Sequence, residues 1–276
     1  MEKSYKFGLL GFPVSQSRSP VIHNTLGELK NIDLTYELMS TEPEILADRI
    51  SNLYESGYDG FNVTVPHKCN VIPSLVGIST EAKCVGAVNT CVRTEGGYFG
   101  YNTDIYGITK SIEEAGADIT NRICVVYGAG GAARAVIYSL ISMGAGMVYV
   151  IDRTVEKAKK LADDINCVLS TDKVGIITEE AAVIELTDIF LFQCTSVGMK
   201  AGECIVKDMR IFEHSLLAFD IIAMDTEFVR IAGSRGIPSQ NGTRMLLYQG
   251  IKAFELWTGL SVTEDEISKM KEATGL

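Results

Sequence analysis

The sequence predicts an α/β fold of two domains, each built on a mostly parallel β-sheet with helices packed over it. Short apolar runs alternate with segments of helical periodicity from the first residues onward. A glycine-rich turn at Gly128–Gly131 directly follows one apolar run in the middle of the chain. The length of 276 residues favours about two domains over a single core.

The first domain is predicted to alternate strands and helices. The expected strands are the apolar or alternating runs 6–10, 34–38 and 60–64. The expected helices span 20–29 and 42–56. Pro20 suits the first turn of its helix, which leaves Ser19 as the predicted N-cap.

The second domain begins with a helix near Ile105. Its expected strands are the apolar runs 123–127, 147–151, 189–193 and 216–221. A last helix, 242–259, has apolar residues at helical spacing and a glycine C-cap, and we expect it to return to the first domain. We therefore predict one domain at 1–105 with 241–276, and the other at 106–240.

Composition excludes several classes of function. With 46% hydrophobic and 22% charged residues, the chain has the composition of a soluble globular protein. A net charge of −10 without any basic run argues against nucleic acid, whose affinity comes mainly from Lys and Arg on phosphates. Because no stretch approaches ~18 apolar residues and the start lacks the apolar core of a signal peptide, we expect a cytoplasmic protein that binds no membrane.

The cysteines and histidines do not suggest a metal site. The 7 cysteines form no CxxC pair, and several lie inside apolar runs, which is typical of reduced, buried thiols. The 3 histidines lack the spacing of metal ligands, either with the cysteines or with each other. We therefore expect no structural or catalytic metal.

Three short strings combine amides, hydroxyls, a lysine and a carboxylate: Asn62–Lys68, Gly86–Thr90 and Asn102–Asp104. We interpret each as the polar end of an apolar, strand-like run, so they should gather at the carboxyl ends of several strands. Buried polar groups must find partners, and a small polyhydroxylated ligand supplies them. The strings therefore predict a ligand site in the first domain.

Lys68 and Asp104 are the candidate catalytic pair in this site. By themselves, a solvated lysine and a helix-capping aspartate would be the ordinary structural explanations. Grouped with the other polar residues, a lysine ammonium beside a carboxylate can donate a proton toward an alcohol or carbonyl oxygen. Hydride transfer between a secondary alcohol and nicotinamide requires such a donor.

Ser17 and Ser19 are candidates for binding an anion. They stand where a strand gives way to a helix, so two hydroxyls lie beside free backbone N–H groups and can hold a carboxylate. The structural explanation is that Ser19 only caps its helix. Arg18, between the serines, should point the other way in an extended segment.

The string 125–136 indicates dinucleotide binding. An apolar strand leads into a GxGxxA turn and a helix of small residues, so Gly128 and Gly130 permit a tight turn and close backbone approach, while Ala133 lets the helix pack on the strand. A pyrophosphate would lie on the N-terminus of that helix. The next strand ends in Asp152, near the spacing expected for an acid that binds ribose. This domain is therefore predicted to be of the Rossmann type.

Jointly, these motifs resemble the shikimate dehydrogenase family along nearly the whole chain. The resemblance rests on the segments 11–20, 62–68, 86–90, 102–107, 128–134 and 194–199, and on the helix with Gln249. It implies reversible reduction of 3-dehydroshikimate to shikimate, usually with NADPH, in aromatic amino acid biosynthesis. It also implies that Lys68 and Asp104 are catalytic, that Ser17 and Ser19 hold the substrate carboxylate, and that Asn62, Thr64, Asn89, Asp104 and Gln249 contact the ring hydroxyls.

The candidate cofactor-binding residues lie in the second half of the chain: Gly128, Ala129, Gly130, Gly131, Ala132, Asp152, Arg153, Thr154, Lys157, Thr195, Met199 and Gly242. The chain departs from the family's pattern at two places. Ala223 stands where the family commonly has a tyrosine near the substrate, and Asp152 stands where NADP-using members usually have Asn. NADP is implied by the resemblance, while Asp152 makes NAD plausible because it accepts hydrogen bonds from ribose hydroxyls and repels a 2′-phosphate.

Two other functions stay open at this point. A quinate or dual quinate/shikimate dehydrogenase would act on a substrate with one more hydroxyl, and Ser19 favours shikimate because relatives that accept quinate often carry threonine there. A non-catalytic, dinucleotide-dependent sensor is the other, and the presence of both Lys68 and Asp104 argues against it. We expect a monomer or homodimer.

Overall fold

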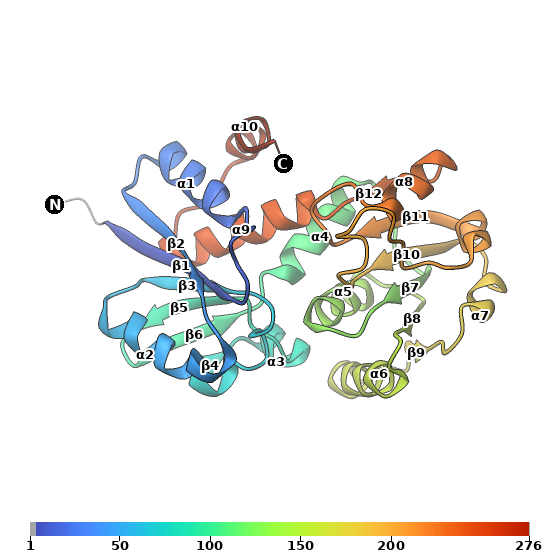
Figure 1. The fold of residues 1–276 in the computed structure, drawn as a ribbon, viewed down its shortest axis with the longest axis horizontal. Helices are drawn as coiled ribbons and strands as arrows, with labels where there is room; N and C mark the ends of the chain where they lie inside the picture. Colours follow the sequence, from blue (N-terminus) through green and yellow to red (C-terminus); the bar gives the residue numbers. More distant parts are fainter. Residues whose placement is uncertain (1–3, 276) are drawn as a thin grey trace. The chain divides into compact units, whose positions relative to one another are not determined.

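The computed structural model describes residues 4–275, which form two compact units. One unit runs up to Tyr106 and resumes at Leu247, and the other is Gly107–Leu246. Each unit contains a six-stranded sheet with helices packed against it (Figure 1). The predicted α/β class, with parallel-rich sheets, is therefore confirmed.

The sheet of the first unit is mixed, with strand order β2-β1-β3-β5-β6-β4. Its strands are β1 Tyr5–Gly11, β2 Leu34–Ser40, β3 Gly60–Val63, β4 Gly77–Ile78, β5 Thr90–Thr94 and β6 Gly97–Tyr101. β1 pairs in parallel with β2 and β3, and β4 with β6, whereas β5 runs antiparallel to both β3 and β6. The β5–β6 pair is a hairpin that the apolar pattern did not predict.

Helices cover both faces of this sheet. They are α1 Ser19–Lys30, α2 Leu46–Glu55, α3 Thr80–Val85 and α9 Thr243–Thr258, with 3₁₀ turns at Pro43–Ile45 and Ile72–Ser74. The last helix, α10 Glu264–Thr274, packs against α1. Successive residues of a strand point to opposite faces, so Phe7 and Leu9 pack with Trp257 of α9, while Leu10 packs with Leu46 and Ile50 of α2. Asn62 of β3 is in register with Leu9 of β1 and therefore lies on the first of these faces.

The sheet of the second unit is wholly parallel, with strand order β12-β11-β10-β7-β8-β9. Its strands are β7 Ile123–Tyr127, β8 Met147–Ile151, β9 Val174–Ile176, β10 Ile189–Gln193, β11 Ser215–Asp220 and β12 Ser239–Gln240. Its helices are α4 Asp104–Glu114, which begins in the first unit, α5 Gly131–Ser142, α6 Val155–Leu169, α7 Ala181–Ile184 and α8 Glu227–Ser234, with a 3₁₀ segment Met209–His214. The chain order reverses between β7 and β10, which is the switch point of a Rossmann fold.

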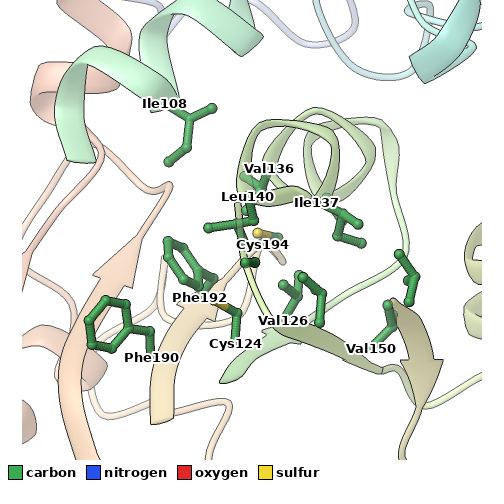
Figure 2. Packing of buried hydrophobic residues seen from close by; sticks show 14 of the residues in the cluster. Ile108, Cys124, Val126, Val136, Ile137, Leu140, Val150, Phe190, Phe192 and Cys194 are labelled. Carbon is green, nitrogen blue, oxygen red and sulfur yellow. The ribbon is translucent and has the colours of Figure 1, made fainter. Parts of the chain in front are cut away.

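Two apolar layers hold the second sheet. Cys124 and Val126 of β7 face α5, as Figure 2 shows with the α5 residues Val136, Ile137 and Leu140 and the β10 residues Phe190 and Phe192. Val125 and Tyr127, one position out of step, pack on the other face with Phe212 and Phe228. Burial on both faces explains why these strands are continuous apolar runs.

The cysteine thiols are unpaired, and most of them lie inside the two units. All seven cysteines are free, and Cys91, Cys124, Cys194 and Cys204 are buried. Within residues 4–275, no three His, Cys, Asp or Glu side chains are grouped as a metal site would require. None of the helices described is both long and apolar enough to cross a lipid bilayer.

Candidate active site

Lys68 and Asp104 are in direct contact. The Lys68 Nζ donates a hydrogen bond to Asp104 Oδ2 at 2.6 Å, and the two side chains are only 16% and 7% exposed. Such a charge-assisted bond, largely shielded from water, fixes the ammonium at one place. The geometry is that of a positioned proton donor.

Amide groups hold the second oxygen of the same carboxylate. Asn89 Nδ2 donates to Asp104 Oδ1 at 2.8 Å, and Asn89 Oδ1 accepts from the Thr103 backbone N–H at 2.7 Å. Asn102 Oδ1 accepts from the Asp104 backbone N–H at 3.1 Å. Each carboxylate oxygen of Asp104 therefore has its own donor, which defines the orientation of the group.

The network continues from Asn89 to Asn62. Asn62 Nδ2 donates to Thr90 Oγ1 at 3.0 Å and to the Asn89 carbonyl at 3.1 Å, and Thr90 Oγ1 donates to Asn89 Oδ1 at 3.1 Å. All three side chains are buried. Thr90 and Thr103 belong to the polar strings, but they were not among the residues predicted to have a role. Their hydroxyls contact each other at 3.1 Å and complete the network.

Strand register brings these residues together. Asn62 of β3 pairs with Thr90 of β5, and Thr90 pairs with Tyr101 of β6, just before Asn102. The prediction that all three strings end strands is therefore wrong for Gly86–Thr90, which leads into the start of β5. Because β5 is antiparallel to its neighbours, its first residue lies at the same edge as the last residues of β3 and β6.

Ser17 and Ser19 contact each other at the start of α1. Ser17 Oγ donates to Ser19 Oγ at 3.1 Å and accepts from the Ser19 backbone N–H at 3.2 Å. The helix begins at Ser19 with Arg18 as the N-cap residue, so the prediction that Ser19 is the N-cap is wrong by one position. Since no side chain caps this helix, the Ser19 hydroxyl is not used for capping.

Arg18 contacts a different part of the first unit. Its guanidinium donates to the carbonyl oxygen of Thr274, at the end of α10, at 2.6 Å. A cation is favourable at the C-terminus of a helix, where carbonyl groups lack partners. This contact fits the prediction that Arg18 points away from the two serines.

Thr64 and Gln249 lie on separate elements of the first unit. Thr64 follows β3 and is half-buried, and a Cβ on Gly11 would collide with its methyl group. Gln249 is buried on α9. Their predicted contacts with substrate stay predictions.

In the second unit, the glycine turn has the local geometry that a dinucleotide requires. Gly128 has φ +112, and a Cβ there would lie 2.9 Å from the Cys194 carbonyl oxygen, so only glycine fits. Gly130 is the N-cap of α5 and makes no side-chain cap, and a Cβ at Gly130 would meet no atom within 4 Å. The N–H groups of Gly131 and Ala132, in the first turn of α5, have no partner within the helix and are available to an anion there.

Asp152 contacts this turn. Its Oδ2 accepts from the Ala129 backbone N–H at 3.1 Å, and its Oδ1 accepts from the Thr154 N–H at 2.8 Å. Thr154 is the N-cap of α6, while Arg153 and Lys157 are exposed. The carboxylate is thus held at the strand end beside the turn, and two cations lie on neighbouring positions of the chain.

Two further loops follow β10 and β12. In the first, Val197 donates its N–H to Thr195 Oγ1 at 3.1 Å, and Met199 is 63% exposed. In the second, the Gly242 N–H donates to the Ile222 carbonyl at 2.8 Å, and a Cβ at Gly242 would collide with the Ile221 carbonyl. Close backbone approach therefore requires glycine at position 242.

Asp220 anchors the loop that contains Ala223. Its Oδ1 accepts from the Ile222 N–H at 2.9 Å, and its Oδ2 accepts from Thr226 Oγ1 at 2.6 Å. Burial raises the pKa of this carboxyl to about 6, against the opposing effect of the two hydrogen bonds. The sequence analysis assigned no role to Asp220, although a carboxylate at the end of an apolar strand indicates a buried anchor for the loop that follows.

Family models cover most of the chain. The model described as "Shikimate dehydrogenase substrate binding domain" matches residues 9–91, and "Shikimate / quinate 5-dehydrogenase" matches residues 110–221. The model "Shikimate 5'-dehydrogenase C-terminal domain" matches residues 242–267. The three matches follow one another along the chain and include Lys68, Asn89, the glycine turn and α9.

Curated relatives and solved structures agree with these models. "Shikimate dehydrogenase (NADP(+))" of Caldanaerobacter subterraneus subsp. tengcongensis is 38% identical, over 92% of this chain and 91% of the relative. The enzyme of the same name from Carboxydothermus hydrogenoformans is 35% identical, over 98% and 96%.

Among solved structures, shikimate dehydrogenase from Aquifex aeolicus superposes with a TM-score of 0.88 at 33% identity, covering 97% of each chain. The Thermus thermophilus enzyme in complex with NADP(H) and shikimate gives 0.86 at 32% identity, with 98% of each chain covered. Quinate dehydrogenase from Corynebacterium glutamicum in complex with NAD gives 0.87 at 29% identity, again with 98% covered. On the strength of its curated relatives and of the family models, this chain belongs to the shikimate dehydrogenase family.

Proposed function

We propose that this protein catalyses the reversible, dinucleotide-dependent reduction of 3-dehydroshikimate to shikimate. The observation that carries the proposal is the Lys68–Asp104 ion pair, 2.6 Å long and joined to Asn89 and Asn62 by buried hydrogen bonds, in a chain of this family. We further propose that the unit up to Tyr106 with the segment from Leu247 binds the substrate, and that Gly107–Leu246 binds the dinucleotide.

In the proposed mechanism, Lys68 transfers the proton. Its ammonium donates a proton to the carbonyl oxygen of 3-dehydroshikimate, which becomes the hydroxyl of shikimate, and the amine takes the proton back in the reverse reaction. Asp104 holds Lys68 in place through its Oδ2, while Asn89 holds Oδ1. The bound dinucleotide supplies or accepts the hydride.

Substrate recognition is proposed to use hydroxyls and amides. Ser17 and Ser19 would hold the carboxylate, because Ser17 Oγ and Ser19 Oγ lie 3.1 Å apart and can both turn their hydrogens toward an anion. Asn89, Asn62, Thr64 and Gln249 would contact the ring hydroxyls. Asn62 would have to accept from a ring hydroxyl through Oδ1, because both hydrogens of its Nδ2 already donate within the protein.

Cofactor choice is proposed to include both nucleotides, with NADP as the default that the relatives' names suggest. The carboxylate of Asp152 would repel a 2′-phosphate by a few kcal/mol at contact distance in a partly exposed site. Arg153 and Lys157, both exposed, would attract it by a comparable amount. We therefore expect measurable activity with NADP and with NAD, and better use of NAD than in typical family members.

The deciding experiment measures reduction of NADP and of NAD by the purified protein with shikimate, and separately with quinate. Activity with shikimate that exceeds activity with quinate supports the proposal, and the reverse result identifies a quinate dehydrogenase. Binding of a dinucleotide without turnover of either substrate would identify a sensor. Size-exclusion chromatography of the same preparation tests the expected monomer or homodimer, and cell fractionation tests the expected cytoplasmic location.

A further inference from the structure

Tyr36 lies at the end of the buried network, on β2. Its hydroxyl donates to Asn62 Oδ1 at 2.7 Å, and the side chain is only marginally exposed. Tyr36 is 26 residues away from Asn62 in the chain and belongs to none of the three polar strings. The hydroxyl is therefore a contribution of the tertiary fold.

The Tyr36 hydroxyl fixes which way the Asn62 amide points. Asn62 Nδ2 uses its two hydrogens on the Asn89 carbonyl and on Thr90 Oγ1. Asn62 Oδ1 must then face a donor, and Tyr36 supplies it. A flipped amide would place an N–H against the Tyr36 hydroxyl and an oxygen against the Asn89 carbonyl, leaving that carbonyl without its donor.

From Asn62, hydrogen bonds lead to the catalytic pair. Thr90 Oγ1 donates to Asn89 Oδ1 at 3.1 Å, and Asn89 Nδ2 donates to Asp104 Oδ1 at 2.8 Å. A defined Asn62 amide therefore defines the Asn89 amide, which holds one oxygen of Asp104 while Lys68 holds the other. Every bond in this sequence lies in the first unit and between buried or half-buried groups.

The Tyr36 hydroxyl keeps its proton in its buried environment. Burial raises the pKa of Tyr36, and the Ser19 side chain, which interacts with the Tyr36 hydroxyl, opposes this rise. The hydroxyl therefore stays protonated over the working pH range and remains a donor.

The ring of Tyr36 is held independently of its hydroxyl. It stacks on the ring of His23, with centroids 4.5 Å apart and an interplanar angle of 13°, and it lies tilted against Trp257. Burial lowers the pKa of His23 to about 3, so the stacking partner is uncharged near neutral pH. Replacing Tyr36 by phenylalanine would therefore remove one hydroxyl and leave the ring in place.

We propose that Tyr36 is a positioning residue, which orients the catalytic Asp104 through Asn62 and Asn89. The proposal rests on the proposed function. It predicts a defect confined to the substrate side of the reaction, because none of these bonds involves the second unit.

The test compares Tyr36→Phe with Tyr54→Phe. Tyr54 is a matched control in the same unit: its hydroxyl also donates within the fold, to the Thr94 and Glu95 carbonyls, and its ring also packs on an aromatic neighbour, Tyr98. We expect Tyr36→Phe to lower kcat/KM for shikimate about tenfold, the equivalent of one ordinary hydrogen bond, with reductions in kcat and increases in KM both contributing. KM for the dinucleotide should be unchanged, and Tyr54→Phe should match the wild type.

A second variant tests the route through Asn62. If Tyr36 acts through this amide, adding Tyr36→Phe to Asn62→Ala should lower kcat/KM for shikimate by less than a further factor of about two. The reason is that the effects of substitutions within one hydrogen-bond network are not additive. Wild-type kcat/KM in Tyr36→Phe, a fully additive double variant, or an Asn62→Ala variant with full kcat would each overturn the proposal. Should Tyr36→Phe not fold, Asn62→Ala alone decides. A wild type without shikimate activity would instead refute the proposed function.

Discussion

Replacing Asp220 by asparagine should stabilise the second unit by an amount that grows from about pH 4 and reaches its full size above about pH 6. The Asp220 carboxyl is buried, and burial raises its pKa from 3.8 to about 6. The folded protein therefore holds this proton more tightly than the unfolded chain does. The contribution of Asp220 to the free energy of unfolding falls as the pH rises from about 4 to about 6, and stays at its lowest value above that.

The size of the effect follows from the same two pKa values. Their difference corresponds to about 3 kcal/mol of unfavourable free energy for the charged form in the folded state. Asparagine removes the charge and keeps both contacts, since Oδ1 can accept from the Ile222 N–H and Nδ2 can donate to Thr226 Oγ1. Up to about 3 kcal/mol of added stability is therefore expected at pH 8, and none at pH 4.

Urea unfolding followed by circular dichroism at pH 4, 6 and 8 measures this difference. Asp225→Asn is the matched control, because Asp225 is an exposed carboxylate of the same loop that accepts from Asn241 Nδ2 at 2.8 Å. It should give no stabilisation that grows with pH. An equal effect of Asp220→Asn at pH 4 and pH 8, or a loss of stability at pH 8, would show that the carboxyl is not protonated as argued.

Three kinetic predictions accompany this one. Lys68→Ala and Asp104→Asn should each lower kcat by roughly 10²–10⁴ with a smaller change in KM, as measured by steady-state rates with shikimate. A Lys68→Ala variant that binds shikimate weakly but keeps wild-type kcat would mean that Lys68 only binds the substrate. Asp152→Asn should shift the ratio of kcat/KM values toward NADP by roughly tenfold or more. It should also weaken the binding of both cofactors slightly, because the contact with the Ala129 N–H is lost. A wild type that is strictly NADP-dependent, together with a variant that behaves like it, would contradict the role of Asp152. Ala223→Tyr should lower KM for shikimate, because the added hydroxyl can bond to the substrate carboxylate, and a hydrogen bond to a charged group contributes about 1.5–3 kcal/mol. An unchanged KM would indicate that the backbone at 223 differs from that of relatives with tyrosine.

The second sheet was predictable because burial on both faces makes its strands apolar along their whole length. The runs 123–127, 147–151 and 189–193 coincide with β7, β8 and β10, and the glycine turn marks the first crossover. By contrast, β4 and β12 have two residues each and β9 has three, which is too short for any periodicity to appear. The end of the last helix was predictable from the glycine at position 259. In the structure Gly259 has φ +72 and directly follows α9.

The candidate site was predictable only as far as it is local in sequence. Lys68, Asn89 and Asp104 stand in compact polar strings, and a resemblance to a family assigns them together. The direction of β5 was not predictable, because its residues Arg93 and Thr94 interrupt the apolar pattern and antiparallel pairing leaves no mark on a single strand. The bond from Tyr36 to Asn62 depends on pairing between three strands, which only the tertiary fold determines.

Trp257 gives this protein a built-in fluorescence probe for one of its two units. It is the only tryptophan of the chain, and its indole lies directly over Gly60, donates to the Cys91 carbonyl at 2.8 Å and stacks on Phe7. Its emission therefore reports the loss of packing in the first unit, and the second unit has no such reporter. Because α9 carries Trp257 and also supplies Met245 to the core of the second unit, coincident fluorescence and dichroism transitions would show that the two units unfold together.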